Sequence, residues 1–207
     1  MSLRIHGLLR RGDLRLDLDL DLPLGVCAVT GPNGAGKSSV LRLIAGLEAL
    51  DAGRLTIDGT VVDDREAGVF VPPEARDVAM AFQQPRLFPH LTVLQNIAYP
   101  LRRRGLPAAE ALEGARPHLE RVGAAAFAEL RPRQLSGGQA QRTAIGVAMA
   151  IGASTIGLDE PLASIDEAGT AEIRRLLHDL ATPRVVWVTH DPADAVGADH
   201  VVHLESP

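Results

Sequence analysis

The stretch that most constrains the fold runs from Gly31 to Ser38 and reads GPNGAGKS, which fits the pattern G-x-x-x-x-G-K-[ST]. The apolar run Gly25 to Thr30 precedes it and predicts a short buried strand, and a helix from about Lys37 to Ala45 follows it. Such a loop points successive backbone N–H groups at phosphate oxygens, and the helix adds its positive dipole end. The sequence therefore predicts a phosphate-binding loop, in which Lys37 contacts the β and γ phosphates and Ser38 binds Mg²⁺.

Length and composition predict one well-packed domain, because 207 residues with 46% hydrophobic content suffice for a single core. The net charge of −5 argues against nucleic acid as a partner, since such binding relies on many Lys and Arg contacts to phosphate. Cys27 is the only cysteine, which excludes an internal disulfide, and the first residues do not resemble a secretory signal. These two observations predict a cytoplasmic location. The longest uncharged run, Thr143 to Leu158, is shorter than a membrane span, so we do not expect the chain to cross a membrane by itself.

The segments around the phosphate loop have the periodicity of strands. From Leu14 to Leu24 leucine occupies every even position and mostly charged residues occupy the odd ones, which predicts a half-buried antiparallel strand. Short β-prone pieces follow at Arg54 to Ile57, Thr60 to Val62 and Val78 to Phe82, separated by turn residues. We expect them to complete an antiparallel edge and then return the chain to the core.

The second half of the chain predicts a helical lobe followed by alternating strands and helices. Residues 85–150 are alanine-rich, and four prolines are expected to mark helix starts and stops: Pro100, Pro107, Pro117 and Pro132. A strand into Asp159 comes next, followed by predicted elements at Glu167 to Leu180, Arg184 to Thr189, Pro192 to Val196 and Val201 to Leu204. This alternation indicates a parallel α/β core. Together with the phosphate loop and the antiparallel segments, it gives a predicted α/β fold with a P-loop NTPase core, a mixed sheet, an antiparallel β edge and a helical lobe.

Two further motifs carry polar chemistry. Ser136 stands before Gly137-Gly138-Gln139 and an apolar helix, so it is a predicted N-cap, and an exposed helix start attracts anions. Considered alone, this segment is equally well a capped surface helix. Asp159 and Glu160 end a buried strand and face different directions, so Asp159 can hold the Mg²⁺ hydration shell while Glu160 accepts a proton from the attacking water.

Together with the phosphate loop, the Ser136 segment resembles the ABC ATPase family. The resemblance implies that this segment contacts the γ-phosphate held by the opposite subunit of an ATP-bound homodimer. His190, after the strand Arg184 to Thr189, corresponds to the family's γ-phosphate histidine, and Gln83 to the glutamine of the metal and water shell. Asp166 resembles part of the loop that crosses the dimer interface.

The predicted site thus has three overlapping sets of residues. The catalytic residues are Lys37, Gln83, Glu160 and His190, and the metal ligands are Ser38, Gln83 and Asp159. ATP is assigned to Gly31, Pro32, Asn33, Gly34, Ala35, Gly36, Lys37, Ser38, Ser39, Ser136, Gly137, Gly138 and Gln139. The resemblance also implies one ABC ATPase domain over residues 1–207, with a RecA-like core and β edge in 1–84 and 151–207 and the helical lobe in 85–150.

The stretch Pro85 to Val93 resembles import-type ATPases, which receive a coupling helix from the membrane partner there. The segments Arg10 to Leu16, Pro72 to Glu74 and Gln84 to Phe88 are most similar to molybdate ATPases, many of which carry a C-terminal regulatory domain, whereas this sequence ends at Pro207. The resemblance implies ATP and Mg²⁺ as cofactors, a transmembrane permease partner, an indirectly acting solute-binding protein and attachment to the inner membrane face through the permease.

The sequence departs from the family pattern in places. No aromatic residue precedes Phe70 to stack on adenine, so Arg10 or Arg11 is the expected substitute. Thr155 and Gly157 stand where the family prefers large aliphatic residues, and Val147 where it has arginine, which predicts looser packing and slow catalysis. Two alternatives stay open, a soluble non-transport ABC ATPase and a weakly hydrolytic regulatory nucleotide-binding module. The transported solute and the permease are not determined by the sequence.

Overall fold

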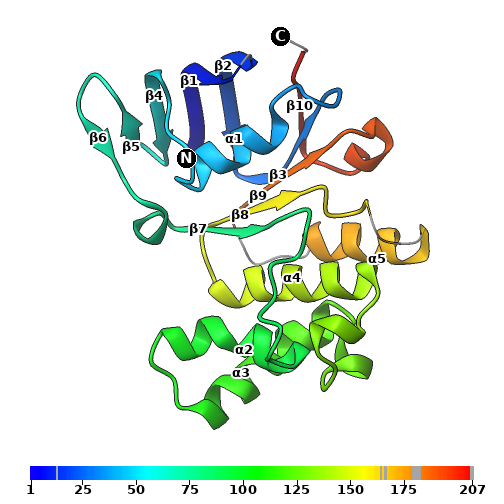
Figure 1. Cartoon of the computed structure of the whole chain (residues 1–207). Coiled ribbons are helices and arrows are strands. Elements are labelled where there is room, and N and C mark those ends of the chain that lie inside the picture. Colours follow the sequence, from blue (N-terminus) through cyan, green and yellow to red (C-terminus); the bar gives the residue numbers. More distant parts are fainter. Residues whose placement is uncertain (13, 164, 166, 179–182, 206–207) are drawn as a thin grey trace. The chain divides into compact units, whose positions relative to one another are not determined.

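The computed structural model describes residues 1–12, 14–163, 165, 167–178 and 183–205 (Figure 1). The chain forms two compact units: unit 1 comprises Met1–Val78 with Pro183–Pro207, and unit 2 comprises Ala79–Thr182. Unit 2 therefore holds the predicted strand that ends at Asp159 as well as the predicted helical lobe. The predicted domain division after residues 84 and 150 stays a prediction.

Unit 1 contains an antiparallel sheet with the strand order β2-β1-β4-β5-β6. Its strands are β1 (Ser2–Arg11), β2 (Leu14–Pro23), β4 (Ala52–Ile57), β5 (Thr60–Asp64) and β6 (Val69–Phe70). The leucines of β2 at even positions from 16 to 22 are buried, and the aspartates between them are exposed. The predicted half-buried antiparallel strand is confirmed, whereas β1 had not been predicted.

Two glycines face each other across β1 and β4. Gly7 pairs with Gly53, and a Cβ added to either would collide with backbone of the opposite strand. Gly53 also has φ of 95°, a conformation that residues with a Cβ avoid. Close approach of the two backbones therefore fixes the register of this strand pair.

The second sheet of unit 1 is parallel, as predicted, and carries the phosphate loop. In it β3 (Gly25–Thr30) lies between β10 (His200–His203) and β9 (Arg184–Thr189). Helix α1 (Lys37–Ile44) follows β3 and buries Val40, Leu41, Leu43 and Ile44, and the short 3-10 helix η4 (Pro192–Ala195) follows β9. The buried strand and helix that the motif requires are thus both present.

A fully buried arginine joins the two sheets of unit 1. Arg184, the first residue of β9, donates from Nε to the carbonyls of Leu22 and Pro23 at 3.1 and 3.2 Å. Its Nη2 pairs with Asp58 Oδ1 at 2.7 Å in the turn between β4 and β5. The buried charge is compensated by these oxygens, so Arg184 stabilises the junction of three strand ends.

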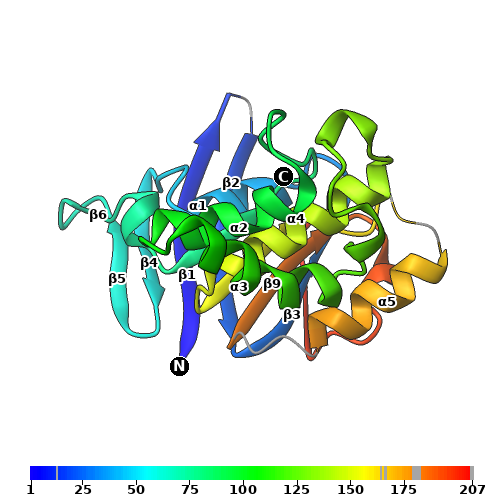
Figure 2. The same cartoon turned by 90° about the horizontal axis from the view of Figure 1, so that it is seen from below.

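Unit 2 is dominated by helices α2 (Val93–Arg103), α3 (Ala108–Arg121) and α4 (Gly137–Ile151), which pack on one another (Figure 2). It also contains the neighbouring strands β7 (Val78–Ala81), which begins at the end of unit 1, and β8 (Thr155–Asp159). Helix α5 (Glu167–His178) and the 3-10 turns η2 (Ala125–Phe127) and η3 (Pro132–Gln134) complete it, and η1 (Pro73–Ala75) belongs to unit 1. Within the described residues, no helix combines the length and the apolar character that a bilayer span requires.

The prediction that all four prolines mark helix ends is wrong for two of them. Pro107 is the N-cap of α3 and Pro132 begins η3, but Pro100 lies within α2 and Pro117 within α3. In α3 the buried residues Ala111, Ala115 and Leu119 form one apolar stripe on both sides of Pro117. Packing of this stripe outweighs the hydrogen bond that proline removes.

Candidate nucleotide-binding site

The phosphate loop in unit 1 is built from glycines with positive φ. Gly34 and Gly36 have φ of 84° and 86°, in the left-handed region that favours glycine. A Cβ on Gly36 would collide with the side chain of Leu16, whereas a Cβ on Gly34 would meet no atom within 4 Å. Gly36 is thus required for conformation and for space, while the loop at Gly34 is open to an incoming group.

Lys37 begins α1 and is 7% exposed. Its Nζ donates to the carbonyl oxygens of Gly31 at 2.8 Å and Pro32 at 2.9 Å, so the ammonium lies against the loop that precedes it. Lys37 is also the only lysine of the chain, since the other 20 of the 21 basic residues are arginines. A phosphate oxygen is a stronger acceptor than a neutral carbonyl, so the ammonium is available for exchange to a nucleotide.

His190 lies at the same sheet edge as the loop. Thr30 at the end of β3 pairs with Thr189 at the end of β9, so the phosphate loop and His190 leave neighbouring parallel strands at the same level. His190 is exposed, and its neighbour Asp191 caps η4 by accepting from the N–H of Ala193 at 2.8 Å. The crevice beyond the carboxyl ends of parallel strands is the usual ligand position in open α/β sheets.

In unit 2, the two carboxylates at the end of β8 differ in environment. All five residues of β8 are buried, and Asp159 is 6% exposed, whereas Glu160 is partly exposed. Glu160 has φ of 50°, which costs a residue with a Cβ about 1–2 kcal/mol. The backbone therefore turns sharply after Asp159, which supports the prediction that the two side chains face different directions.

Gln83 follows β7, which neighbours β8, and is exposed. The oxygens of Ser38, Gln83 and Asp159 are hard donors of the kind that Mg²⁺ prefers. Among the residues that the structure describes, no group of three or more His, Cys, Asp or Glu side chains could hold a metal ion. A Mg²⁺ ion bound by any of these oxygens would need further oxygens from phosphate and water, which is the common form of magnesium site.

The Ser136 segment begins α4 with a capping box. Ser136 Oγ accepts from the N–H of Gln139 at 3.3 Å, and Gln139 Oε1 accepts from the N–H of Ser136 at 3.0 Å. The predicted N-cap is confirmed. Ser136 and Gly137 are exposed, so the positive end of a 15-residue helix faces outward.

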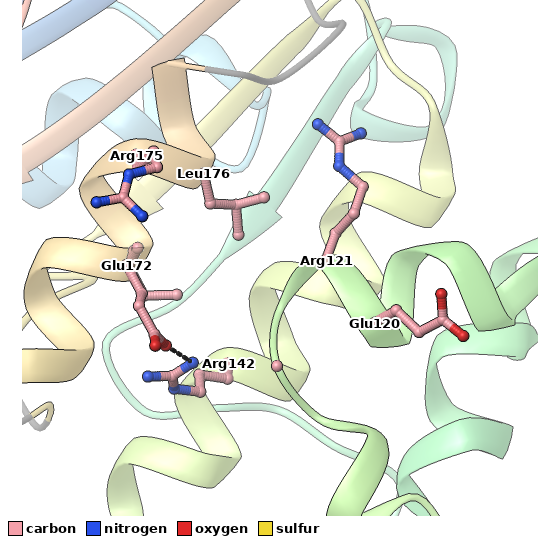
Figure 3. A pocket seen from close by; sticks show the side chains of 8 residues that line it. Glu120, Arg121, Arg142, Glu172, Arg175 and Leu176 are labelled. Atoms are coloured by element: carbon pink, nitrogen blue, oxygen red, sulfur yellow. Dashed lines mark hydrogen bonds and ion pairs between the residues drawn. The ribbon is translucent and has the colours of Figure 1, made fainter.

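Sequence reasoning had given no role to Arg142, six residues after Ser136. Its Nη1 donates to Glu172 Oε2 of α5 at 2.9 Å (Figure 3). The same Nη1 donates to the carbonyl of Val122, just after α3, at 3.3 Å. These contacts hold α4 against both elements. They lie beside a hollow of about 370 Å³ that is lined by Arg121 and Arg175 among others.

The predicted site residues are divided between the units. Unit 1 holds the phosphate loop with Ser38 and Ser39, and it also holds His190; unit 2 holds Gln83, Ser136 to Gln139, Asp159 and Glu160. Asp166 lies outside the described residues. The strand with Thr155 and Gly157 is wholly buried in spite of its small residues.

Comparison with known proteins identifies the class. The family described as "ABC transporter" matches residues 16–163, and the chain belongs to this family. It is similar to the molybdenum import ATP-binding protein ModC of Mycobacterium tuberculosis (strain H37Rv), with 45% identity over 94% of this chain and 55% of that protein. It is also similar to the trehalose/maltose import ATP-binding protein MalK of Thermococcus litoralis, with 41% identity over 80% of this chain and 45% of that protein. The chain spans about half the length of these curated relatives.

Solved structures agree in fold. A dimeric post-hydrolysis state of the ATP-binding cassette MJ0796, bound to ADP and Pi, matches with a TM-score of 0.83 and 28% sequence identity. The match covers 99% of this chain and 95% of that one. The predicted ABC ATPase fold is therefore confirmed.

Proposed function

We propose that this chain is the ATP-binding and ATP-hydrolysing subunit of an ABC importer. The observation that carries the proposal is the phosphate loop, with Lys37 held over it at the start of α1, in a member of the ABC transporter family. The names of the relatives, which are import ATP-binding proteins, support the direction of transport.

In the proposed reaction the loop amides and the Lys37 ammonium bind the β and γ phosphates. Ser38, Asp159 and Gln83 would hold Mg²⁺ directly or through water, and would thereby place positive charge beside the phosphate oxygens. Glu160 accepts the proton of the attacking water, and His190 contacts the γ-phosphate. Each of these residues binds, orients or moves a proton, as phosphoryl transfer requires.

A second copy of the chain would complete the proposed site. The Ser136 helix start of that copy would bind the γ-phosphate with its exposed amides, so two nucleotides close a homodimer and hydrolysis reopens it. The solved dimer of the related cassette supports this arrangement. Opening and closing of the dimer would then be transmitted to a membrane partner.

The proposed partner is a permease, which would place the chain on the cytoplasmic face of the membrane; a solute-binding protein would act through the permease. A hollow of about 510 Å³ supports a docking surface on the helices of unit 2, lined by His90, Tyr99, Arg102 and Arg103 among others. The described residues that line it include no carboxylate, which suits an acidic segment of the permease. Molybdate is the proposed solute because several similar relatives are molybdenum import proteins.

Phosphate release tests the proposal and separates it from the alternatives. We expect the purified chain to release phosphate from Mg·ATP, and the rate to rise when the intact complex with its permease and solute-loaded binding protein is reconstituted. A chain that binds ATP without measurable release in either preparation is a regulatory module. A non-transport ATPase would release phosphate at the same rate with and without the permease. Its purified native complex would also contain no permease.

Selectivity between ATP and GTP tests the prediction that an arginine replaces the aromatic residue that stacks on adenine. Arg11 is engaged with Glu48, Asp51 and the carbonyl of Ala49, so Arg10 is the better placed substitute for an aromatic residue. A guanidinium stacks on any purine, and we expect ATP and GTP to compete with affinities within about threefold of each other. Competition against a fluorescent ATP analogue measures this ratio, and a strong preference for ATP would contradict the prediction.

A further inference from the structure

Arg76 lies in unit 1, at the end of η1, and is 5% exposed although it carries a full charge. Its guanidinium donates to four backbone carbonyls from three segments. Nη1 donates to Leu43 and to Ile44, the latter at 3.2 Å; Nη2 donates to Val62 at 3.1 Å; and Nε donates to Val71 at 2.7 Å. Leu43 and Ile44 are the last two residues of α1, whose C-terminal carbonyls have no partner within the helix.

The surroundings of Arg76 are shaped to hold the guanidinium. A Cβ on Gly46 would lie 2.7 Å from Arg76 Nε, so glycine is required there for space. The ring of Phe70 covers the guanidinium, with 5.2 Å between Cζ and the ring centroid. Asp63 is 2% exposed and interacts electrostatically with Arg76, which compensates part of the buried charge.

Helix α1 transmits any displacement at this end to the phosphate loop. It has only eight residues, so the Leu43 and Ile44 carbonyls that Arg76 binds lie about 10 Å along the helix axis from Lys37 at its first position. A helix of two turns moves as a rigid body. A positive charge at its C-terminal end also matches the helix dipole, whose opposite end faces the nucleotide.

We propose that Arg76 is a positioning residue for nucleotide binding: by anchoring the last carbonyls of α1 it fixes the tilt of the helix whose first turn cradles the phosphates. This inference rests on the proposed function. It predicts an effect on nucleotide affinity beyond the effect on stability, because the group that Arg76 holds in place is the phosphate cradle itself.

Paired variants of two buried arginines test the inference. Arg184 is the matched control: it lies in the same unit, is fully buried and also donates to backbone carbonyls, but it contacts neither α1 nor the phosphate loop through the bonds described above. We expect Arg76→Met to weaken binding of the fluorescent nucleotide mant-ADP about tenfold, and Arg184→Met to leave it within about twofold at equal loss of thermal stability. Arg76→Lys keeps the charge but cannot reach all four carbonyls, so an intermediate loss is expected.

The measurement is made well below the unfolding temperature of each variant. Equal affinities for wild type and both Arg76 variants would overturn the inference, and so would losses of the same size in Arg76→Met and Arg184→Met. If Arg76→Met does not fold, Arg76→Lys is compared with Arg184→Lys by the same criterion. A wild-type chain that binds no mant-ADP would overturn the proposed function itself. If the wild type binds mant-ADP but Arg76→Met shows no selective loss, only the role of Arg76 is overturned and the proposed function stands.

Discussion

Replacing Glu160 by glutamine is expected to lower ATP turnover by about a hundredfold or more, the usual contribution of a general base. Glutamine keeps the shape of the side chain but cannot accept a proton at neutral pH. ATP binding is therefore expected to remain, and Mg·ATP should accumulate a closed homodimer that the wild type passes through only transiently. Steady-state phosphate release measures the first effect, and size-exclusion chromatography with Mg·ATP measures the second.

Glu113→Gln is a suitable control for this variant. Glu113 lies on α3, pairs with Arg116 at 3.1 Å and is 70% exposed at its side chain, so its amide should leave turnover unchanged. Unchanged turnover in Glu160→Gln would remove Glu160 from its assigned role. Lost turnover without the dimer would instead show that nucleotide binding had failed as well.

The second large effect is expected from Lys37→Ala. This change removes the only ammonium of the loop, and we expect nucleotide affinity to fall about a hundredfold, or ~3 kcal/mol, because charge-assisted bonds to phosphate are lost. Titration of a fluorescent ADP analogue measures the loss. Arg42→Ala is the matched control, since Arg42 lies in the last turn of the same helix and pairs with Glu48 at 3.5 Å.

An Arg42→Ala variant that loses as much affinity as Lys37→Ala would mean that any basic residue of α1 contributes by charge alone. Retained affinity in Lys37→Ala would contradict the assignment of the phosphate site to this loop. The two variants together separate a specific contact from a general electrostatic attraction.

The sequence predicted the parts of the fold in which one local pattern dominates. The alternation in β2 and the apolar runs of β3 and β9 were sufficient to predict these strands, because the apolar side chains themselves are the ones that are buried. β1 was missed because Gly7 and the pair Leu8-Leu9 interrupt its alternation, and its pairing on both sides is set by tertiary contacts. The prediction that Pro100 and Pro117 mark helix ends was wrong for the same reason, because tertiary packing outweighed the low helix propensity of proline.

Site prediction worked from motifs and missed the residues that hold them. Lys37, Ser136 and Glu160 stand out because loop, cap and strand end are local features. Arg76 and Arg142 could not be found in this way, because their most distant partners lie 33 and 30 residues away in sequence and their partners are backbone carbonyls or a surface carboxylate. For Arg76 the only signal in the sequence was an arginine among turn residues, which usually indicates a solvated side chain.

The glycine contact between β1 and β4 also bears on how this chain can change over evolutionary time. Because neither Gly7 nor Gly53 tolerates a Cβ, the two strands cannot slide past each other to absorb a lost or gained residue. A single deletion within β1 would turn its inward side chains to the outer face. Length variation should therefore concentrate in exposed connections such as residues 65–68 between β5 and β6, while the strands themselves keep their number of residues.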